Sequence, residues 1–386
     1  MDFDLSEDQE ALRDAIRQFA EREIRPIAEQ MDQDDIFPPE LWLRLGEMGL
    51  LGIGVPEEYG GSGGDLMNWV VAGEEIAACS SAVSLSMGAH GNLCVWNLYN
   101  NGSESQRQRW LPDLCSGRKV GSLCITEPDT GSDAVGMQTR AVADRGDFLL
   151  TGTKTWITNA PVADLFIVYA KTNPEAGARG ITAFVLERGM DGLSFSKPFD
   201  KSGCRGSPTG QVYMDGVRVG PENILGGLDR GVNVLMSGLD VERAIFASLP
   251  VGQSRRCLEL AIQYAQERKQ FGRPIASFQL VQAKIADMYT NLEASRLMVW
   301  KACHALTKME RGGKGTPTHK LAAAALLFAA EAAEKIAYDA VQIHGGNGFS
   351  KEFEVNRIYR DSRLGTIGAG TSEIRRLIIA RELLGG

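Results

Sequence analysis

A chain of 386 residues is long enough to bury large cores and to form two or three domains. Its composition, with 44% hydrophobic and 23% charged residues, is that of an ordinary globular protein. The formal net charge of −8 argues against a nucleic-acid-binding surface and against a polybasic membrane patch. We therefore expect small molecules or proteins as partners, with no nucleic acid and no membrane insertion.

The N-terminal sequence MDFDLSEDQE is acidic and lacks the patterns of a signal peptide and of a transit peptide. This favours a cytoplasmic protein of bacterial type, or an organellar form that has already been processed. The most apolar run, at 321–340, carries Glu331, Glu334 and Lys335 and is interpreted as a buried bundle helix. The seven cysteines are odd in number and form no C-x-x-C pair, so we expect buried reduced thiols and no metal site.

The first third of the chain is predicted to be helical. Apolar periodicity predicts an amphipathic helix over residues 5–30, and Ser6 followed by Gln9 predicts a capping box at its start. Helical patterns continue to about residue 118. We expect an N-terminal α-helical domain over residues 1–120.

The pattern then changes twice. Short β-rich runs between turns predict a middle β domain over residues 121–228. Long apolar-periodic runs at about 231–266, 276–310 and 317–343 predict an antiparallel C-terminal helical bundle over residues 229–386. The segment ERGGKGTP between two of these runs is interpreted as a flexible loop. The predicted fold class is therefore mainly α with a central all-β domain.

Glu242 has unusual neighbours for a carboxylate. Four apolar residues share its side of a predicted helix: Leu235, Leu239, Ile245 and Phe246. Asp240 and Arg243 point elsewhere and can pair with each other. Apolar surroundings raise the pKa of a carboxyl group, which would make Glu242 a useful base near neutral pH. The alternative is a glutamate at the edge of the stripe, bonded to an arginine or lysine from another part of the chain.

Two stretches in the β region have the composition of a site for a flat polar cofactor. CITEPDTGSD (124–133) offers the hydroxyl groups of Thr126 and Ser132 beside a turn, and WITN (156–159) places Trp156 near Thr158. An isoalloxazine ring needs a stacking wall and short hydrogen-bond donors, which these stretches could supply. The alternative is a tight hairpin with a core tryptophan.

Three further stretches lie in the helical half: ERKQFGRPIASFQ, QIHGGNG and IGAGTSE. Arg268 in the first could meet a pyrophosphate with two donors. The third is a glycine-rich turn that leads into a helix N-terminus, which favours a phosphate or an electron-rich flavin edge. Glycine turns at helix ends also occur for purely structural reasons. No G-x-G-x-x-G after a strand and no Walker motif is present, which disfavours a Rossmann or P-loop nucleotide site.

Taken together, the motifs identify a family. The chain carries ITEPDTGSD, WITN, RGITAF, MSGLDVER, ERKQFGRPIASFQ, QIHGGNGF and IGAGTSEIRR in this order. On these motifs the whole chain resembles the acyl-CoA dehydrogenase family and is most similar to its isovaleryl-CoA dehydrogenase branch. The resemblance implies an N-terminal helical domain, a middle β-barrel or sandwich domain and a C-terminal four-helix bundle. It also implies FAD as the cofactor, an acyl-CoA thioester as the substrate and a homotetramer.

The resemblance assigns roles to individual residues. Flavin contacts are implied for five residues of the β region: Leu123, Ile125, Thr126, Trp156 and Thr158. Six residues resemble the positions that reach FAD across a subunit boundary: Arg268, Gln270, Phe271, Gln279, Gln342 and Gly346. Thr371 and Glu373 resemble the cofactor contacts that follow the glycine turn. Substrate contacts are implied for five residues: Ser132, Asp240, Arg243, Gly368 and Ala369.

The resemblance also bears on the catalytic base. Most relatives place a glutamate immediately before the GT of the glycine turn, where this chain has Ala369. The isovaleryl branch carries it in the LD-x-ER stretch instead, which matches Glu242. The resemblance therefore implies that Glu242 removes the α-proton while FAD accepts a hydride, giving a trans-2-enoyl-CoA. Electrons would then pass to electron-transfer flavoprotein.

The acyl group is predicted with more than one candidate. Gly368, where many relatives have an aromatic residue, favours a 3-methyl acyl group such as isovaleryl. Gly365, Thr366, Asp129 and Trp96 depart from the isovaleryl pattern, so a longer β-methyl acyl group of the citronellyl type, or a straight chain, is a competitor. The sequence is also compatible with a flavin oxidase, with a member acting on a non-CoA thioester and with a non-catalytic helical scaffold.

Overall fold

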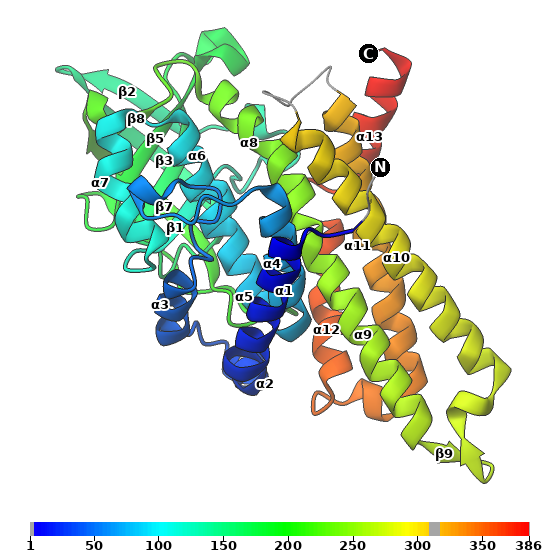
Figure 1. Cartoon of the computed structure of the whole chain (residues 1–386). Helices are drawn as coiled ribbons and strands as arrows, with labels where there is room; N and C mark the ends of the chain where they lie inside the picture. The colour runs from blue at the N-terminus through cyan, green and yellow to red at the C-terminus, as the bar shows by residue number, and fades with distance from the viewer. Residues whose placement is uncertain (1–3, 309–316, 386) are drawn as a thin grey trace.

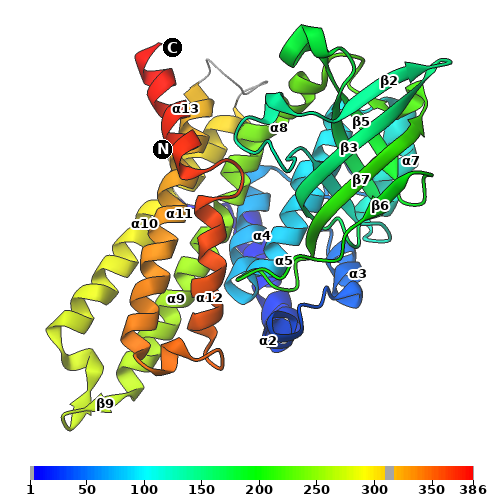
Figure 2. The same cartoon turned by 180° about the vertical axis from the view of Figure 1, so that it is seen from behind.

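The computed structural model describes residues 4–308 and 317–385. The predicted loop ERGGKGTP lies outside these residues, except for its final Pro317. Figure 1 shows a β domain and a long helical bundle on opposite sides of a group of N-terminal helices, and Figure 2 shows the same arrangement from behind. In the part of the chain that the structure describes, no helix is long and apolar enough to cross a membrane.

The N-terminal part is helical, as predicted. Its elements are α1 (Glu7–Phe19), η1 (Ala20–Ile24), α2 (Arg25–Asp34), α3 (Pro39–Glu47), η2 (Glu57–Tyr59), α4 (Leu66–Cys79), α5 (Ser81–Gly88), η3 (Ala89–Val95), α6 (Trp96–Asn101) and α7 (Glu104–Cys115). The predicted capping box is confirmed, because Ser6 and Gln9 exchange hydrogen bonds between side chain and backbone. The first predicted helix runs from α1 through a π-helical turn, η1, into α2.

The middle part forms one mixed sheet. Its strands are β1 (Gly121–Cys124), β2 (Arg140–Asp144), β3 (Asp147–Thr158), β4 (Leu165–Lys171), β5 (Ile181–Glu187), β6 (Leu193–Phe195), β7 (Thr209–Val219) and β8 (Ile224–Leu225), with short helices η4 (Ala134–Gly136), η5 (Pro174–Gly180) and η6 (Pro221–Asn223). The strand order is β6-β7-β3-β2-β4-β5-β8, and β1 pairs in parallel with β4. Strand β4 is buried along most of its length, which makes it the centre of this domain.

The C-terminal part is again helical. It contains α8 (Gly231–Phe246), α9 (Ser248–Glu267), the hairpin β9 (Lys269–Gln270) and β10 (Arg273–Pro274), η7 (Ile275–Ser277), α10 (Gln279–Thr307), α11 (Pro317–His344), η8 (Asn347–Phe349), α12 (Glu354–Ser362), η9 (Arg363–Thr366) and α13 (Ser372–Leu384). The single helix predicted over 231–266 is wrong in one respect, because it divides at Ala247 into α8 and α9. Pro250 explains the division, since it has no N–H to continue the helical ladder.

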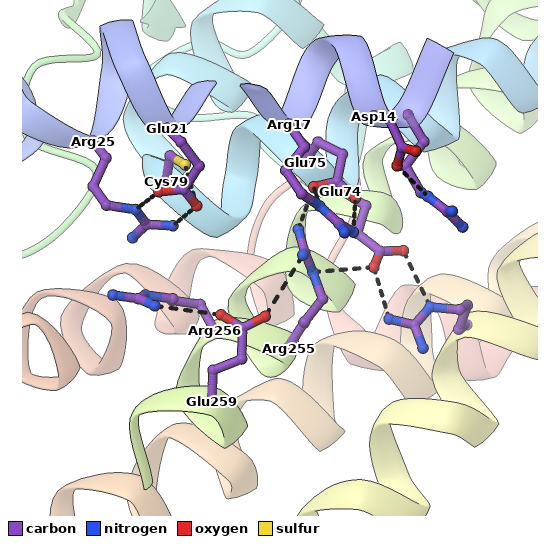
Figure 3. Close-up of polar contacts among 12 residues, drawn as sticks. Asp14, Arg17, Glu21, Arg25, Glu74, Glu75, Cys79, Arg255, Arg256 and Glu259 are labelled. Atoms are coloured by element: carbon purple, nitrogen blue, oxygen red, sulfur yellow. Dashed lines mark hydrogen bonds and ion pairs between the residues drawn. The ribbon is translucent and has the colours of Figure 1, made fainter. Parts of the chain in front are cut away.

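A cluster of charged side chains joins the N-terminal helices to the bundle (Figure 3). Glu75 on α4 is buried and accepts two hydrogen bonds from Arg17 on α1, at 3.0 and 2.9 Å. It also accepts one from Arg255 on α9, at 2.7 Å. Glu74 pairs in the same way with Arg296 on α10, at 2.7 Å. These bonds fix the position of α4, which packs against α9 and contacts α8.

All seven cysteines are buried and free, which confirms the prediction of reduced thiols. Burial raises the pKa of each thiol for which a shift is resolved, for example that of Cys115 to about 12. These thiols are therefore inert packing groups rather than nucleophiles.

Candidate active site

Glu242 lies in the second half of α8, the helix between the β domain and the bundle (Figures 1 and 2). Of its predicted apolar neighbours, Leu235 and Ile245 are buried. The half-buried carboxylate forms no hydrogen bond and no ion pair with any residue that the structure describes. Burial raises its pKa to about 7, against the lowering effect of the positive charges of Arg243 and Arg375. The predicted rise in pKa is confirmed, and the alternative of a bonded arginine or lysine is not met within the described chain.

The predicted pairing of Asp240 with Arg243 is also confirmed. Nη1 of Arg243 donates to Oδ1 of Asp240 at 3.1 Å, and both side chains are buried. The same oxygen lies 2.7 Å from Nδ1 of His319 at the start of α11. His319 was missed at the sequence level, because no spacing rule connects it to α8.

The glycine turn, residues 368–371, leads into α13. Ala369 and Gly370 both have positive φ, 53° and 86°. Thr371 is the N-cap of α13, and its hydroxyl accepts from the amide of Ile374 at 3.3 Å. Glu373 is exposed in the first turn of the helix. Helix α11 packs against both α8 and α13, and the positive charge of Arg375 on α13 acts on the pKa of Glu242.

Arg375 is a residue of this region that sequence reasoning missed. It is fully buried, and its guanidinium donates to the carbonyl oxygens of Gly365, at 2.9 Å, and of Gly368. One signal in the sequence could have found it. A cation in the first turn of a helix is opposed by the helix dipole, so an arginine there requires another reason.

The two glycines near the turn differ in their surroundings. A Cβ atom at Gly365 would lie 3.2 Å from the Cβ of Ala330 on α11, so this glycine permits close packing of η9 against α11. The atoms nearest to a Cβ atom at Gly368 would be those of Leu364, at 3.4 Å or more, which is ordinary contact distance. A Cβ atom is therefore accommodated at position 368 without steric conflict, whereas the absence of a side chain at position 365 serves packing.

The structure brings the five predicted flavin contacts of the β region together. The hydroxyl of Ser122 donates to the carbonyl of Thr158 at 2.7 Å, and the amide of Thr155 donates to the carbonyl of Thr126 at 2.8 Å. These bonds join β1 and the segment that follows it to the end of β3. The predicted flavin contacts that lie along these two adjoining segments are Leu123, Ile125, Thr126, Trp156 and Thr158.

Trp156 is not the core tryptophan of the alternative interpretation. It is 63% exposed, has a φ of 58° and contacts Phe199, with ring centroids 4.8 Å apart. A shift in the pairing of β3 with β7 between Lys154 and Ile157 accounts for its outward direction. The hydroxyls of Thr126 and Thr158 form no hydrogen bond within residues 4–308 and 317–385. An exposed indole beside two free hydroxyl groups fits the flat polar ring of a flavin.

A buried ion pair also connects β3 to the segment after β1. The ammonium group of Lys154 donates to Glu127 at 2.8 Å and to the carbonyl of Ile125 at 3.0 Å, with no exposure of the lysine side chain. Ser132, in the turn that follows Glu127, is exposed.

The remaining predicted cofactor contacts lie elsewhere. They are exposed residues near the β9–β10 hairpin and at the adjacent end of α11: Arg268, Gln270, Phe271, Gln279, Gln342 and Gly346. Stacking of Tyr264 on His344, at 4.2 Å between ring centroids, holds these two ends together. We call these six residues the hairpin group. The hairpin group lies at the opposite end of the bundle from α8 and α13 (Figures 1 and 2). A single chain therefore does not bring it to Glu242.

Comparison with known proteins identifies the family. The models of the acyl-CoA dehydrogenase N-terminal, middle and C-terminal domains match residues 6–118, 122–217 and 229–384. The chain is 46% identical over 377 residues to the mitochondrial isovaleryl-CoA dehydrogenase of Solanum tuberosum, covering 97% of this chain and 90% of that protein. It is 45% identical over 381 residues to the mitochondrial 2-methylacyl-CoA dehydrogenase of the same plant, covering 98% and 91%.

Among solved structures, butyryl-CoA dehydrogenase from Megasphaera elsdenii aligns over the whole of both chains, with a TM-score of 0.95 and 35% identity. The chain therefore belongs to the acyl-CoA dehydrogenase family, as its motifs predict, and has the fold of that family. It is an oxidoreductase that acts on CH–CH bonds, and its family uses FAD.

Proposed function

We propose that the protein oxidises the α,β bond of a branched 3-methyl acyl-CoA, with isovaleryl-CoA as the leading candidate, to the trans-2-enoyl-CoA. One observation carries this proposal: Glu242 is a carboxylate without an ion-pair partner in the described chain, has a pKa raised to about 7, and lies in one region with a glycine turn that has no glutamate of its own at position 369. The identity to an isovaleryl-CoA dehydrogenase supports the choice of substrate.

Glu242 is the proposed base. A carboxylate that titrates near pH 7 is matched to proton removal at neutral pH, because enough of it is ionised while its proton affinity is high. No hydrogen bond from the described protein has to be broken before it accepts the α-proton. Asp240 keeps Arg243 in place, so Arg243 adds positive charge near the thioester without neutralising the base.

FAD would be held by the adjoining segments of β1 and β3, with the indole of Trp156 as the wall and the hydroxyls of Thr126 and Thr158 as hydrogen-bonding groups. When bound, it supplies the acceptor for the hydride that leaves the β-carbon. Thr371 and Glu373 would contact it at the N-terminus of α13, where free amides favour an electron-rich edge. Ser132, Asp240, Arg243, Gly368 and Ala369 are the proposed substrate contacts.

The assembly is proposed to be a homotetramer. The hairpin group is exposed and distant from Glu242, so it can serve a cofactor only if that cofactor is bound by a second copy of the chain. Phe271 of this group is 92% exposed and contacts Phe278 edge to face, with ring centroids 6.0 Å apart, so most of its ring is available to a second copy of the chain. Electron-transfer flavoprotein is the proposed acceptor of the electrons.

The acyl group can be tested with a substrate panel. Isovaleryl-, isobutyryl-, butyryl-, octanoyl- and citronellyl-CoA would be compared with a dye acceptor. We expect the highest kcat/KM for isovaleryl-CoA. A maximum at citronellyl-CoA would favour the longer β-methyl substrate, and a maximum at butyryl-CoA would refute a branched substrate.

The base is tested by Glu242→Gln. This change keeps the shape of the side chain and removes its ability to take a proton, so turnover should fall by several orders of magnitude while FAD and acyl-CoA remain bound. A variant that retained most of its activity would place the base elsewhere. Rapid formation of peroxide in air by the wild-type protein would favour a flavin oxidase instead.

A further inference from the structure

Arg375 has bonding that is unusual for a buried arginine. Its side chain is fully buried, yet both of its hydrogen bonds go to neutral backbone carbonyls, those of Gly365 and Gly368. Its Nε atom has no partner among the described residues. A buried guanidinium is costly unless a negative charge compensates it, so the absence of a paired carboxylate in the described chain calls for an explanation.

Neighbouring arginines follow the usual rule. Arg376, the next residue on α13, pairs with Glu331 at 2.7 Å, and Arg363 pairs with Glu334 at the same distance. Both are exposed. Arg375 is the buried member of this group, and the carboxylates whose charge it feels are those of Glu242, Glu331 and Glu373.

The charge of Arg375 persists at neutral pH. Burial and the like charge of Arg243 lower the pKa of Arg375 to about 10, and Glu242 opposes this change. In return, Arg375 and Arg243 oppose the rise in pKa that burial causes at Glu242. Arg243 has Asp240 as a direct partner, whereas Arg375 has no carboxylate bonded to it in the part of the chain that the structure describes.

We propose that Arg375 is a positioning residue for the dehydrogenation: its two hydrogen bonds hold Gly368 of the glycine turn and Gly365 of η9, and its buried charge, which has no bonded carboxylate in the described chain, acts on Glu242. This inference rests on the proposed role of Glu242 as the base. One rigid guanidinium fork thereby ties α13 to Gly365 of η9 and to Gly368 of the glycine turn.

The turn needs such a support. Ala369 is held in the left-handed region, where a residue with a Cβ atom is strained and persists only if its surroundings fix it. The hydrogen bond from Arg375 to Gly368 holds the residue immediately before Ala369. The bond from Arg375 to Gly365 connects η9 to the same guanidinium group. Lysine carries its donors on a single nitrogen, so it would not reproduce the geometry in which two separate guanidinium nitrogens bond to Gly365 and Gly368.

The charged and titratable groups around Glu242 define the expected pH effect. Arg243 comes from α8, Arg375 from α13, and Tyr169 from β4, where the charge of Glu242 contributes to a raised pKa of the buried phenol. Asp240 and His319 bond to each other, and Asp240 also bonds to Arg243. When the charge at position 375 is removed, Arg243 remains as the nearby cation that lowers the pKa of Glu242 against the effect of burial.

The test compares Arg375→Gln, Arg375→Lys and the control Arg376→Gln in the FAD-loaded protein. The dependence of kcat/KM on pH would be measured with isovaleryl-CoA and a dye acceptor. In Arg375→Gln, the midpoint of the acid limb should move to higher pH by roughly 1 unit, because the positive charge that favoured the ionised carboxylate is lost. Arg376→Gln should leave the limb in place. An unmoved limb in Arg375→Gln would overturn the role of the charge.

Arg375→Lys tests the two parts separately and remains informative if the glutamine variant does not fold. It keeps a positive charge and loses the fork, so the limb should stay within about 0.3 pH unit of wild type while kcat/KM falls about tenfold. A displaced limb would overturn the role of the charge, and an unchanged kcat/KM would overturn the role of the fork.

A measurement without turnover checks the same pKa. Binding of the product-class ligand 3-methylcrotonyl-CoA, followed by flavin absorbance across the pH range, should show the same displacement in Arg375→Gln. The outcomes separate the two proposals. If Glu242→Gln keeps its activity, the proposed base is wrong; if it is inactive and the limb does not move in Arg375→Gln, only the inference about Arg375 fails.

Discussion

Nη1 of Arg243 lies 3.1 Å from Oδ1 of Asp240. Arg243, the residue that follows Glu242, is therefore paired with Asp240 and not with Glu242. Glu242 therefore stays without a salt-bridge partner in the described chain, although it follows Asp240 by only two residues. An i, i+3 pair on one side of α8 thus leaves the carboxylate between its members available as a base.

The pH dependence of turnover should report Glu242. Its pKa is raised to about 7 by burial, and only the ionised form can take a proton, so kcat/KM should rise with pH and level off above an acid limb near 7. A pH–rate profile with a non-titrating acyl-CoA measures this. Glu242→Asp retains a carboxylate and should keep a limb with a much lower plateau. A wild-type limb near pH 4.5 would contradict the assignment.

Stability should depend on pH for the same reason. The pKa of Glu242 is about 4.5 in the unfolded chain and about 7 in the folded protein. Its contribution to stability is therefore fully present below pH 4.5 and is lost as the pH rises through about 7. Glu242→Gln cannot ionise, so at pH 8 it should exceed wild type in unfolding free energy by roughly 2 to 3 kcal/mol. At pH 4 the two proteins should be nearly equal, which serves as the internal control. Equal stability at both pH values would speak against a desolvated carboxylate.

The region around Glu242 shows what the sequence could and could not predict. The apolar stripe, the Asp240–Arg243 pair and the start of α13 after its glycine turn followed from periodicity and cap chemistry. His319 and Arg375 were missed, because their partners lie far away in the chain or on the backbone and no local pattern marks such contacts. Helix α12 was missed as well: only Val355 and Ile358 supply a buried apolar face there.

The β region shows the same division. The sequence motifs predicted which residues gather near the end of β3. They left open whether Trp156 faces the core or the solvent, because a shift in strand pairing reverses the face that a side chain occupies. Only the pairing of β3 with β7 decides this point.

Gly368 should control the fit of a branched acyl group. Its Cβ position has ordinary contact distances, so Gly368→Phe should be tolerated by the fold and should fill space beside the turn. We expect the ratio of kcat/KM for isovaleryl-CoA over butyryl-CoA to fall about tenfold or more, as for a pocket that loses room for a methyl group. Gly365→Ala is the contrast: its Cβ would crowd Ala330, so it should lower the unfolding temperature and leave the ratio unchanged. An unchanged ratio in Gly368→Phe would remove this glycine from the substrate site.

The hairpin group should matter for the cofactor and not for the fold of one chain. Arg268 is exposed at the end of α9, so Arg268→Ala should weaken FAD retention about tenfold, as expected for the loss of a charge-assisted contact with phosphate. The neighbouring Lys269→Ala is the matched control and should retain FAD like wild type. Dialysis followed by flavin absorbance gives the comparison, and size-exclusion chromatography gives the oligomeric state. Equal retention in both variants would contradict a cofactor contact from this group.

The charged cluster at the junction of the N-terminal helices and the bundle should contribute strongly to stability (Figure 3). Glu75 is buried between Arg17 and Arg255, so Glu75→Ala leaves two cations without their shared anion and should lower the unfolding free energy by about 3 kcal/mol. Glu259 pairs with Arg255 from an exposed position, and Glu259→Ala should cost less than about 1 kcal/mol. Denaturant unfolding of both variants measures the difference. Similar losses in the two variants would show that burial of the Glu75 carboxylate does not determine its contribution.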